Sequence, residues 1–183
     1  MSGSANSAGV KPDRSRGAIC QVAAAEQISI RPLAPDEGSE LAPQIAGLHA
    51  RLFDPPWQAC AFDTLLAQAG SACFVAQSLN RHMTAGFIIG RLAADEVDVL
   101  TFAVAAQYQR QGIGRRLLAA LSDAAAETGA RRMFVEVAVQ NAAAIGLYLG
   151  VGFYEVGRRS AYYLAADGRR QDGLIMRLEL AAA

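Results

Sequence analysis

The chain has 183 residues, of which 52% are hydrophobic and 19% are charged, a composition apolar enough to build a core and to exclude disorder over most of the length. The 17 Lys and Arg residues balance 17 Asp and Glu residues, which argues against a nucleic-acid partner bound through a strongly basic surface. No apolar run approaches the ~18 residues that a membrane-spanning helix requires, so no membrane association is expected.

The first segment, residues 1–27, is rich in Ser, Gly, Ala and Asn and shows no sustained periodicity. We therefore expect it to be a disordered N-terminal extension. Basic residues precede Cys20, as in a secretory signal, but Gln21 interrupts the apolar run and we reject that interpretation. A periodic pattern begins at Ile28, and residues 28–183 are expected to form a single domain.

Hydrophobic periodicity alternates along this domain between that of strands and that of helices. Apolar residues recur at helical spacing from Leu41 to Leu52, and Pro55 ends that pattern. A turn is expected at residues 80–82. The order predicts an α/β (α+β layered) domain built on a mixed sheet. The expected strands are 28–33, 72–79, 85–92, 97–104, 132–138, 153–159 and 174–180, and the expected helices are 40–53, 57–69, 112–127 and 141–149.

The cysteines and histidines do not suggest a metal or disulfide site. Cys20, Cys60 and Cys73 are widely spaced and form no CxxC motif, which predicts reduced thiols in a cytoplasmic protein. The two histidines, His49 and His82, have no obvious partner in the sequence, so we assign them no role. No metal is expected.

The turn at Gln109–Arg115 has the features of an anion-binding site. It follows an expected strand and opens an expected helix, whose first N–H groups have no internal partner and carry the positive end of the helix dipole. Gly112 and Gly114 allow the backbone to approach a phosphate closely. Arg110 and Arg115 can add charge-assisted hydrogen bonds.

Three kinds of phosphate-binding turn compete at this segment, beside a merely flexible loop with solvated arginines. A nucleotide P-loop is excluded because Arg115 stands where that motif has Lys. A dinucleotide fingerprint is disfavoured because Leu117 replaces its third glycine. The turn that binds the pyrophosphate of coenzyme A, Gln/Arg-x-x-Gly-x-Gly/Ala, is matched by Gln109, Gly112 and Gly114.

A family pattern extends over several blocks of the second half of the chain: 102–104, 108–115, 135–137, 141–148, 152–153, 158–159, 162–163, 167–169, 172 and 175–176. In this order the blocks resemble the GNAT acetyltransferases, and the stretch from about residue 100 to 178 is most similar to their RimI branch. The resemblance implies the GNAT fold: a mixed, mostly antiparallel sheet with a splayed parallel central pair, flanked by helices.

The resemblance implies acetyl-CoA as co-substrate. By position, Glu136 matches the general base of the family and Tyr148 its general acid. Trp57, Tyr162 and Tyr163 are candidates for the acceptor site. The residues matching cofactor-binding positions are Phe102, Ala103, Val104, Gln109, Arg110, Gln111, Gly112, Ile113, Gly114, Arg115 and Asn141.

The residues themselves leave alternatives open. Glu136 is an acid on the face of a strand shared with Phe134 and Ala138, which fits a base in a cleft or a solvated, ion-paired side chain. Tyr148 shares a helix face with the expected N-cap, Asn141, and suits either an acid or core packing. Paired aromatic residues such as the two acceptor-site tyrosines, and Trp57, are also common in packing.

The RimI branch acetylates the N-terminal amine of a small-subunit ribosomal protein, so the resemblance implies a protein N-terminus, a ribosomal one, as acceptor. The alternatives are a GNAT enzyme that acts on a small amine or an internal Lys, and a non-enzymatic acyl-CoA sensor. Two departures concern the acceptor side: residues 138–140 are less polar than is common in the family, and Tyr162 and Tyr163 are shifted by one position relative to Arg159.

Overall fold

A computed structural model describes residues 27–79, 83–164 and 168–181. The expected extension, up to residue 26, and the expected turn at residues 80–82 lie outside the described residues. So do Cys20, His82 and residue 167 of the family resemblance. None of the described helices is long and apolar enough to cross a membrane.

The described chain forms a seven-stranded sheet in the order β1-β2-β3-β4-β5-β7-β6. The element order expected from periodicity is confirmed, with two short 3-10 helices added at Pro35–Glu37 and Ala106–Tyr108. The strands are β1 (Ile28–Pro32), β2 (Ser71–Ser78), β3 (Thr84–Ala93), β4 (Glu96–Val104), β5 (Arg132–Ala138), β6 (Tyr154–Leu164) and β7 (Arg170–Glu179). The α-helices are α1 (Gly38–His49), α2 (Ala59–Leu66), α3 (Ile113–Glu127) and α4 (Ala142–Val151).

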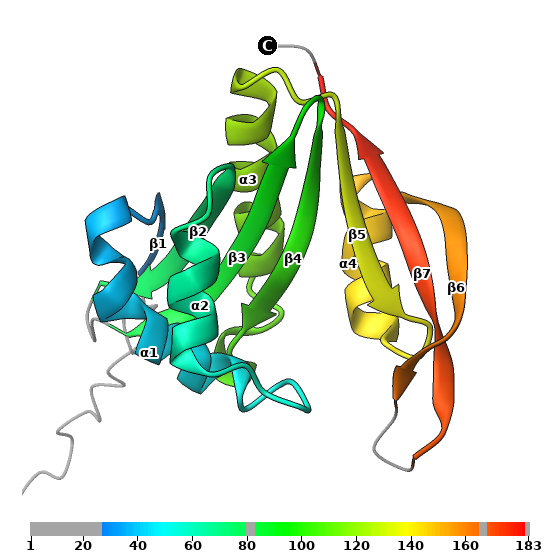
Figure 1. The fold of residues 1–183 in the computed structure, drawn as a ribbon, viewed down its shortest axis with the longest axis horizontal. Helices are drawn as coiled ribbons and strands as arrows, with labels where there is room; N and C mark the ends of the chain where they lie inside the picture. Colours follow the sequence, from blue (N-terminus) through cyan, green and yellow to red (C-terminus); the bar gives the residue numbers. More distant parts are fainter. Residues whose placement is uncertain (1–26, 80–82, 165–167, 182–183) are drawn as a thin grey trace, which may run out of the picture.

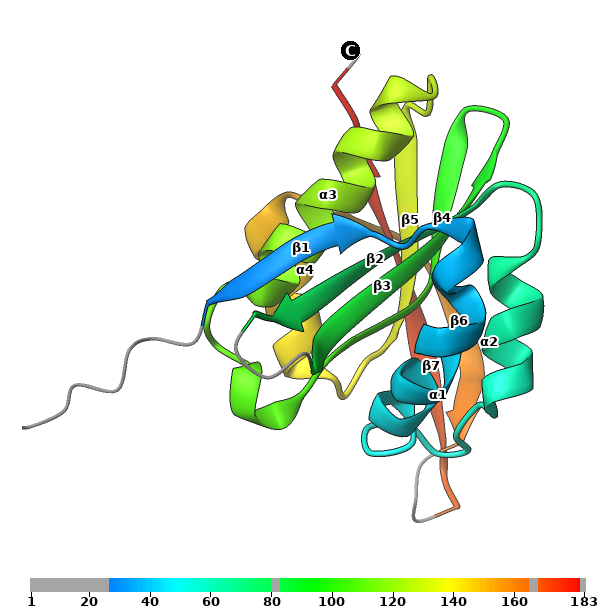
Figure 2. The same cartoon turned by 90° about the vertical axis from the view of Figure 1, so that its left-hand side faces the viewer.

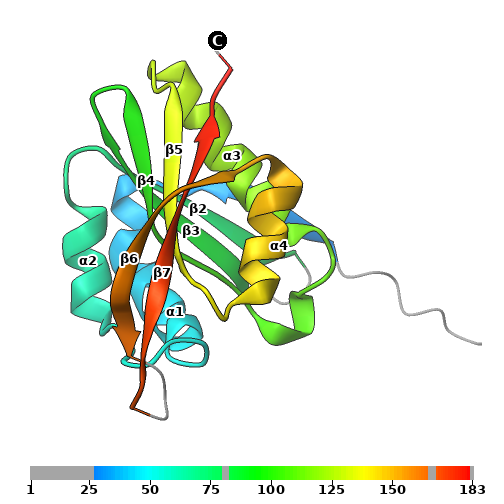
Figure 3. The same ribbon diagram turned by 90° about the vertical axis from the view of Figure 1, so that its right-hand side faces the viewer.

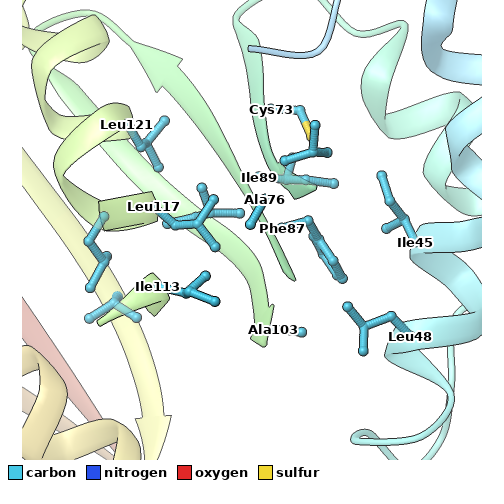
Figure 4. Packing of buried hydrophobic residues seen from close by; sticks show 14 of the residues in the cluster. Ile45, Leu48, Cys73, Ala76, Phe87, Ile89, Ala103, Ile113, Leu117 and Leu121 are labelled. Atoms are coloured by element: carbon cyan, nitrogen blue, oxygen red, sulfur yellow. The ribbon is translucent and has the colours of Figure 1, made fainter. Parts of the chain in front are cut away.

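Helices cover both faces of the sheet, with α1 and α2 on one face and α3 and α4 on the other (Figures 1 and 2). The core lies between these layers. In Figure 4 Leu117 and Leu121 of α3 approach the strands from one side, and Ile45 and Leu48 of α1 approach from the other. Burial of apolar side chains on both faces of the central strands is the main stabilising contribution in such a layered domain.

We expect Leu117→Ala to be among the more damaging single changes to this core. The Leu117 side chain is fully buried and packs on β3 so closely that a Cβ added at Gly86 would lie 3.2 Å from its Cδ1. Truncation leaves a cavity, and should lower the free energy of unfolding in urea by about 3 kcal/mol. The matched change Leu149→Ala, at a leucine 56% exposed on α4, should alter it by less than about 0.5 kcal/mol. Equal losses of unfolding free energy in Leu117→Ala and Leu149→Ala would contradict this packing.

Strands β4 and β5 pair in parallel only over part of their length. Their register runs from Glu96 with Arg132 to Val99 with Val135 and stops there. Beyond this point the two strands diverge, as the opening V of Figure 1 shows. The pairing of β4 with β3 also shifts register here, between Ile89 and Gly90, and such a bulge bends a strand. The splayed parallel pair of the predicted fold class is therefore present.

The hairpin of β6 and β7 is longer than expected, and it lies beside β5 in Figure 3. Its register shifts between Arg159, which is opposite Gly173, and Tyr163, which is opposite Gln171. Ala161 in this irregular stretch has a φ of 52°. Four steps along β6 therefore face two along β7, so β6 carries extra residues that bulge out of the ladder next to the tyrosine pair.

Candidate active site

The diverging strands border a cleft of about 1610 Å³. It is lined by residues of β4, β5, α4 and β6, and by the segment between α1 and α2. Two predicted residues are absent from its lining: Ile113, whose side chain is buried in the core, and Gln111, which is exposed. The cleft brings together the other residues singled out in the sequence: Trp57, Phe102, Ala103, Val104, Gln109, Arg110, Gly112, Gly114, Arg115, Glu136, Asn141, Tyr148, Tyr162 and Tyr163.

The turn before α3 has the geometry of an anion-binding site. Gly112 is the N-cap of α3 in the left-handed conformation, with φ of 77°, and Arg110 also has a positive φ of 62°. The first helical hydrogen bond runs from Arg116 N to Gly112 O, at 3.1 Å. The three N–H groups from Ile113 to Arg115 precede that bond, so they can donate to an anion at the positive end of the helix.

The polar side chains of this turn bind neighbouring carbonyl groups. Arg115 Nη2 donates to Gly150 O at 2.9 Å and so joins the start of α3 to the end of α4. Gln109 Nε2 donates to Val104 O at 2.9 Å. Gln111 Nε2 donates to Gln107 O at 3.0 Å. A guanidinium has five N–H donors, so the bond from Arg115 leaves donors for a phosphate.

Glu136 lies on the face of β5 that borders the cleft, and its side chain is 31% exposed. Its Oε1 accepts an ion-pair contact from Arg159 Nη2 at 2.9 Å. The two side chains come from β5 and β6, with β7 between these strands. Glu136 is thus ion-paired and also borders the cleft, so the geometry is compatible with both sequence alternatives, a cleft base and an ion-paired acid.

Tyr148 is buried on α4, with its ring centroid 6.5 Å from that of Phe102 and 5.4 Å from that of Phe153. Burial raises the pKa of its phenol well above the usual range, so the hydroxyl keeps its proton at neutral pH. Asn141 caps this helix, as expected, through Oδ1, which accepts from Ala144 N at 3.1 Å. Asn141 also lines the cleft, and its amide group carries two N–H donors beside the capping oxygen.

Aromatic side chains line the part of the cleft formed by β6 and by the segment between α1 and α2. Tyr162 and Tyr163 meet edge to face, with centroids 5.0 Å apart, and the Arg159 guanidinium lies 5.1 Å over the Tyr162 ring. Burial and the Glu136 carboxylate raise the pKa of Tyr163. Trp57 is 39% exposed and lines the cleft, so part of its indole can contact a ligand.

The lining also includes residues to which the sequence assigned no role, among them His49, Arg159 and Gln171. His49 was assigned no role for want of a partner, and that reason is wrong. It is buried, and its Nδ1 accepts from Trp57 N at 3.3 Å. The spacing of four residues from His49 to Phe53 was the one available signal in the sequence. Among the described residues, no cluster of three His, Cys, Asp or Glu side chains could hold a metal ion.

Comparison with known proteins identifies the family. Residues 42–153 match the model of the acetyltransferase (GNAT) family. This chain is a GNAT acetyltransferase. The family uses acetyl-CoA, which fits a cleft with an anion-binding turn at one side and an open strand edge beside it.

Several relatives of this GNAT acetyltransferase carry functional names. The ribosomal protein bS18-alanine N-acetyltransferase of Escherichia coli strain K12 is 37% identical over 125 residues, which are 68% of this chain and 82% of that protein. The N-alpha-acetyltransferase RimI of Mycobacterium tuberculosis is 40% identical over 126 residues, 67% of this chain and 78% of that protein. These relatives confirm the enzyme class expected from the sequence.

Solved structures agree on the fold. The crystal structure of the Escherichia coli ribosomal-protein-S18-alanine N-acetyltransferase superposes with a TM-score of 0.75 and 32% identity, covering 86% of this chain and 96% of that one. Arabidopsis thaliana NAA60 in complex with acetyl-CoA superposes with a TM-score of 0.70 and 19% identity, covering 84% and 99%. At that identity the second likeness concerns the fold alone.

Proposed function

We propose that this enzyme acetylates the N-terminal α-amine of a ribosomal protein in the cytoplasm, with acetyl-CoA as donor. The observation that carries the proposal is the similarity, at 37% identity, to an enzyme named for acetylating the alanine of ribosomal protein bS18. The cleft supports it, since aromatic side chains from two separate segments border the place where an extended acceptor would lie.

The donor would be held by groups of the chain that the fold leaves unpaired. Beyond Val99 the edge of β4 toward β5 is open, so residues 102–104 can pair with the amide groups of an extended carrier as an added strand does. The N–H groups at the start of α3 face the place for the diphosphate, with Arg110 and Arg115 beside them. Asn141 supplies an amide donor at the start of α4.

The chemistry requires a neutral amine, a polarised thioester and a hydrogen-bond donor for the departing thiolate, which takes its proton from solvent. An α-amine has a pKa near ~8, against ~10.4 for Lys, so a much larger fraction of it is already neutral near neutral pH. Glu136 would accept the amine proton directly or through one water as the amine attacks the carbonyl carbon. The C–N bond then forms, the C–S bond breaks, and the acyl group passes directly in one ternary complex.

Tyr148 would donate a hydrogen bond to the departing sulfur. Its raised pKa makes complete proton transfer to a thiolate, of pKa about 8.5, unfavourable. We therefore expect the effect of a charge-assisted hydrogen bond, so Tyr148→Phe should lower kcat by about 10- to 100-fold. Steady-state kinetics measure this, with thermal unfolding as control. A kcat within about twofold of wild type would assign Tyr148 to packing alone.

An amine panel tests the proposed acceptor. Purified enzyme and acetyl-CoA are incubated with a peptide of the first residues of the same organism's S18 protein, and mass spectrometry locates the acetyl group. Matched controls are the same peptide with a blocked N-terminus, an internal-Lys peptide and a polyamine. We expect acetyl on the α-amine alone. Turnover confined to Lys or to small amines would support the alternative substrates. Binding of acetyl-CoA without any turnover would support a sensor.

A further inference from the structure

His49 lies at the end of α1 and connects that helix to one side of the cleft. His49 is only 2% exposed. Its Nδ1 accepts a hydrogen bond from the backbone N–H of Trp57, eight residues later, at 3.3 Å. The Nδ1 atom can accept only when it carries no proton, so this contact selects the neutral imidazole with its proton on Nε2.

The same ring is the centre of an aromatic stack. It lies parallel to Phe53, with centroids 4.0 Å apart, and near-parallel to Trp57, at 5.2 Å. Phe62 of α2 packs edge-on at 5.5 Å. We call residues 50–58 the α1–α2 link; it lies at the open end of the splayed strands in Figure 1. Phe53 and Trp57 of this link line the cleft.

Burial in this stack lowers the pKa of His49. The rings that contact it are uncharged, and no ion pair joins it to another described residue. The titratable and charged groups of α1, of the link and of the packed elements α2, β3 and β4 are Glu40, Arg51, Asp54, Cys60, Asp63, Arg91, Glu96 and Asp98. None of them is among the causes of the lowered pKa.

We propose that His49 is a positioning residue: its neutral imidazole holds the α1–α2 link as the acceptor-side wall of the cleft, and its protonation releases that wall. A proton on Nδ1 would face the Trp57 N–H, so the hydrogen bond becomes a contact between two donors. The charge would also have to be accommodated in a buried, uncharged stack. The part of this proposal that concerns the acceptor rests on the proposed function.

The direction of the pH effect follows from linkage. In the released link His49 is solvated and has a pKa near ~6.5, whereas in the packed link its pKa is lower. The released form therefore binds the proton more readily. As the pH falls through the pKa of His49 in the released link, the packed wall loses stability. At a pH above that pKa the wall is fully held.

The full-length enzyme offers a direct probe, because Trp57 is its one tryptophan. We would record its emission from about pH 7.5 to about pH 5, with far-UV circular dichroism on the same samples. Wild type should show a red shift as pH falls, with a midpoint below about 6.5 and no loss of helix signal. His49→Asn and His49→Phe should show no such shift. The matched control is His82→Asn at the other histidine, which should titrate like wild type.

Other outcomes overturn the proposal. The proposal fails if the Trp57 emission of wild type does not change with pH, or if both His49 variants show the same red shift as wild type. It also fails if His82→Asn loses the red shift, or if the red shift coincides with global unfolding. Because this readout needs no substrate, it stands even if the peptide proposed above is not acetylated.

The kinetic arm tests positioning against mere stability. His49→Phe keeps a ring but removes the acceptor for the Trp57 N–H. We expect the KM of His49→Phe for the substrate amine identified in the amine panel to rise about fivefold at neutral pH. This change is equivalent to the loss of one neutral hydrogen bond. The kcat and the KM for acetyl-CoA should stay within about twofold. An unchanged acceptor KM, or an equal loss in all three parameters, would contradict the positioning role.

Discussion

Replacing Glu136 by Gln is expected to lower kcat by about 10³-fold, the effect of removing a general base. The substitution keeps the size of the side chain and removes its ability to accept a full proton. The carboxylate contacts Arg159 and not the turn before α3. The dissociation constant for acetyl-CoA, measured by calorimetry, should therefore remain within about twofold of wild type.

Arg159→Gln is the matched control, because Glu136 has two interpretations. If the carboxylate serves only as half of an ion pair, removing either partner should have the same effect. A pair whose side chains are 50% and 31% exposed contributes at most about 1 kcal/mol, so Arg159→Gln should lower kcat by less than about tenfold. Equal losses in the two variants would assign Glu136 a structural role and require another base.

A second control concerns the acceptor. An α-amine of pKa about 8 is half neutral at that pH, and its neutral fraction rises until about pH 10, so kcat/KM of both wild type and Glu136→Gln should rise with pH through about pH 8. A variant that regained wild-type kcat above about pH 9 would show that deprotonation is all that Glu136 supplies. A persistent deficit there would indicate that it also orients the amine.

The elements that were predictable from the sequence are those whose periodicity is local. Helix α3 has one apolar stripe, with Leu117, Leu118 and Leu121 buried, and β5 alternates residue by residue in burial. Strand β6 was predicted to end five residues early, at Arg159. The reason is physical: it is an edge strand whose residues are nearly all exposed, so there is no alternation to detect.

The site was predictable where a motif lies within one segment. The turn from Gln109 to Arg115 could be read because loop, glycines and helix start are contiguous. The ion pair of Glu136 with Arg159 could not, because it depends on β7 lying between β5 and β6. The contact of His49 with Trp57 likewise requires the chain to fold back after Pro55. Such contacts follow from topology, which periodicity does not encode.

The second large effect is expected at Gly114, in the turn before α3, where a larger side chain should weaken the binding of acetyl-CoA. A Cβ added here would lie 3.0 Å from Leu147 Cδ2 and 3.1 Å from Phe102 Cζ, so the space beside the first turn of α3 is already filled to its limit. Gly114→Val would place methyl groups in the cleft, next to the free N–H groups. Losing access to two charge-assisted hydrogen bonds of about 1.5–3 kcal/mol each should raise the dissociation constant for acetyl-CoA at least about 100-fold.

The matched control is Gly47→Val on α1. Gly47 also has a helical, non-positive φ, but nothing lies within 4 Å of its added Cβ, and it is not part of the cleft lining. Both changes add the same side chain to a helix, and since Val is a better helix former than Gly, both carry a similar propensity gain of a few tenths of a kcal/mol. Calorimetry should show wild-type affinity for Gly47→Val and lost affinity for Gly114→Val. If Gly114→Val bound acetyl-CoA normally, the diphosphate could not lie on the start of α3, and the donor would have to enter the cleft by another route.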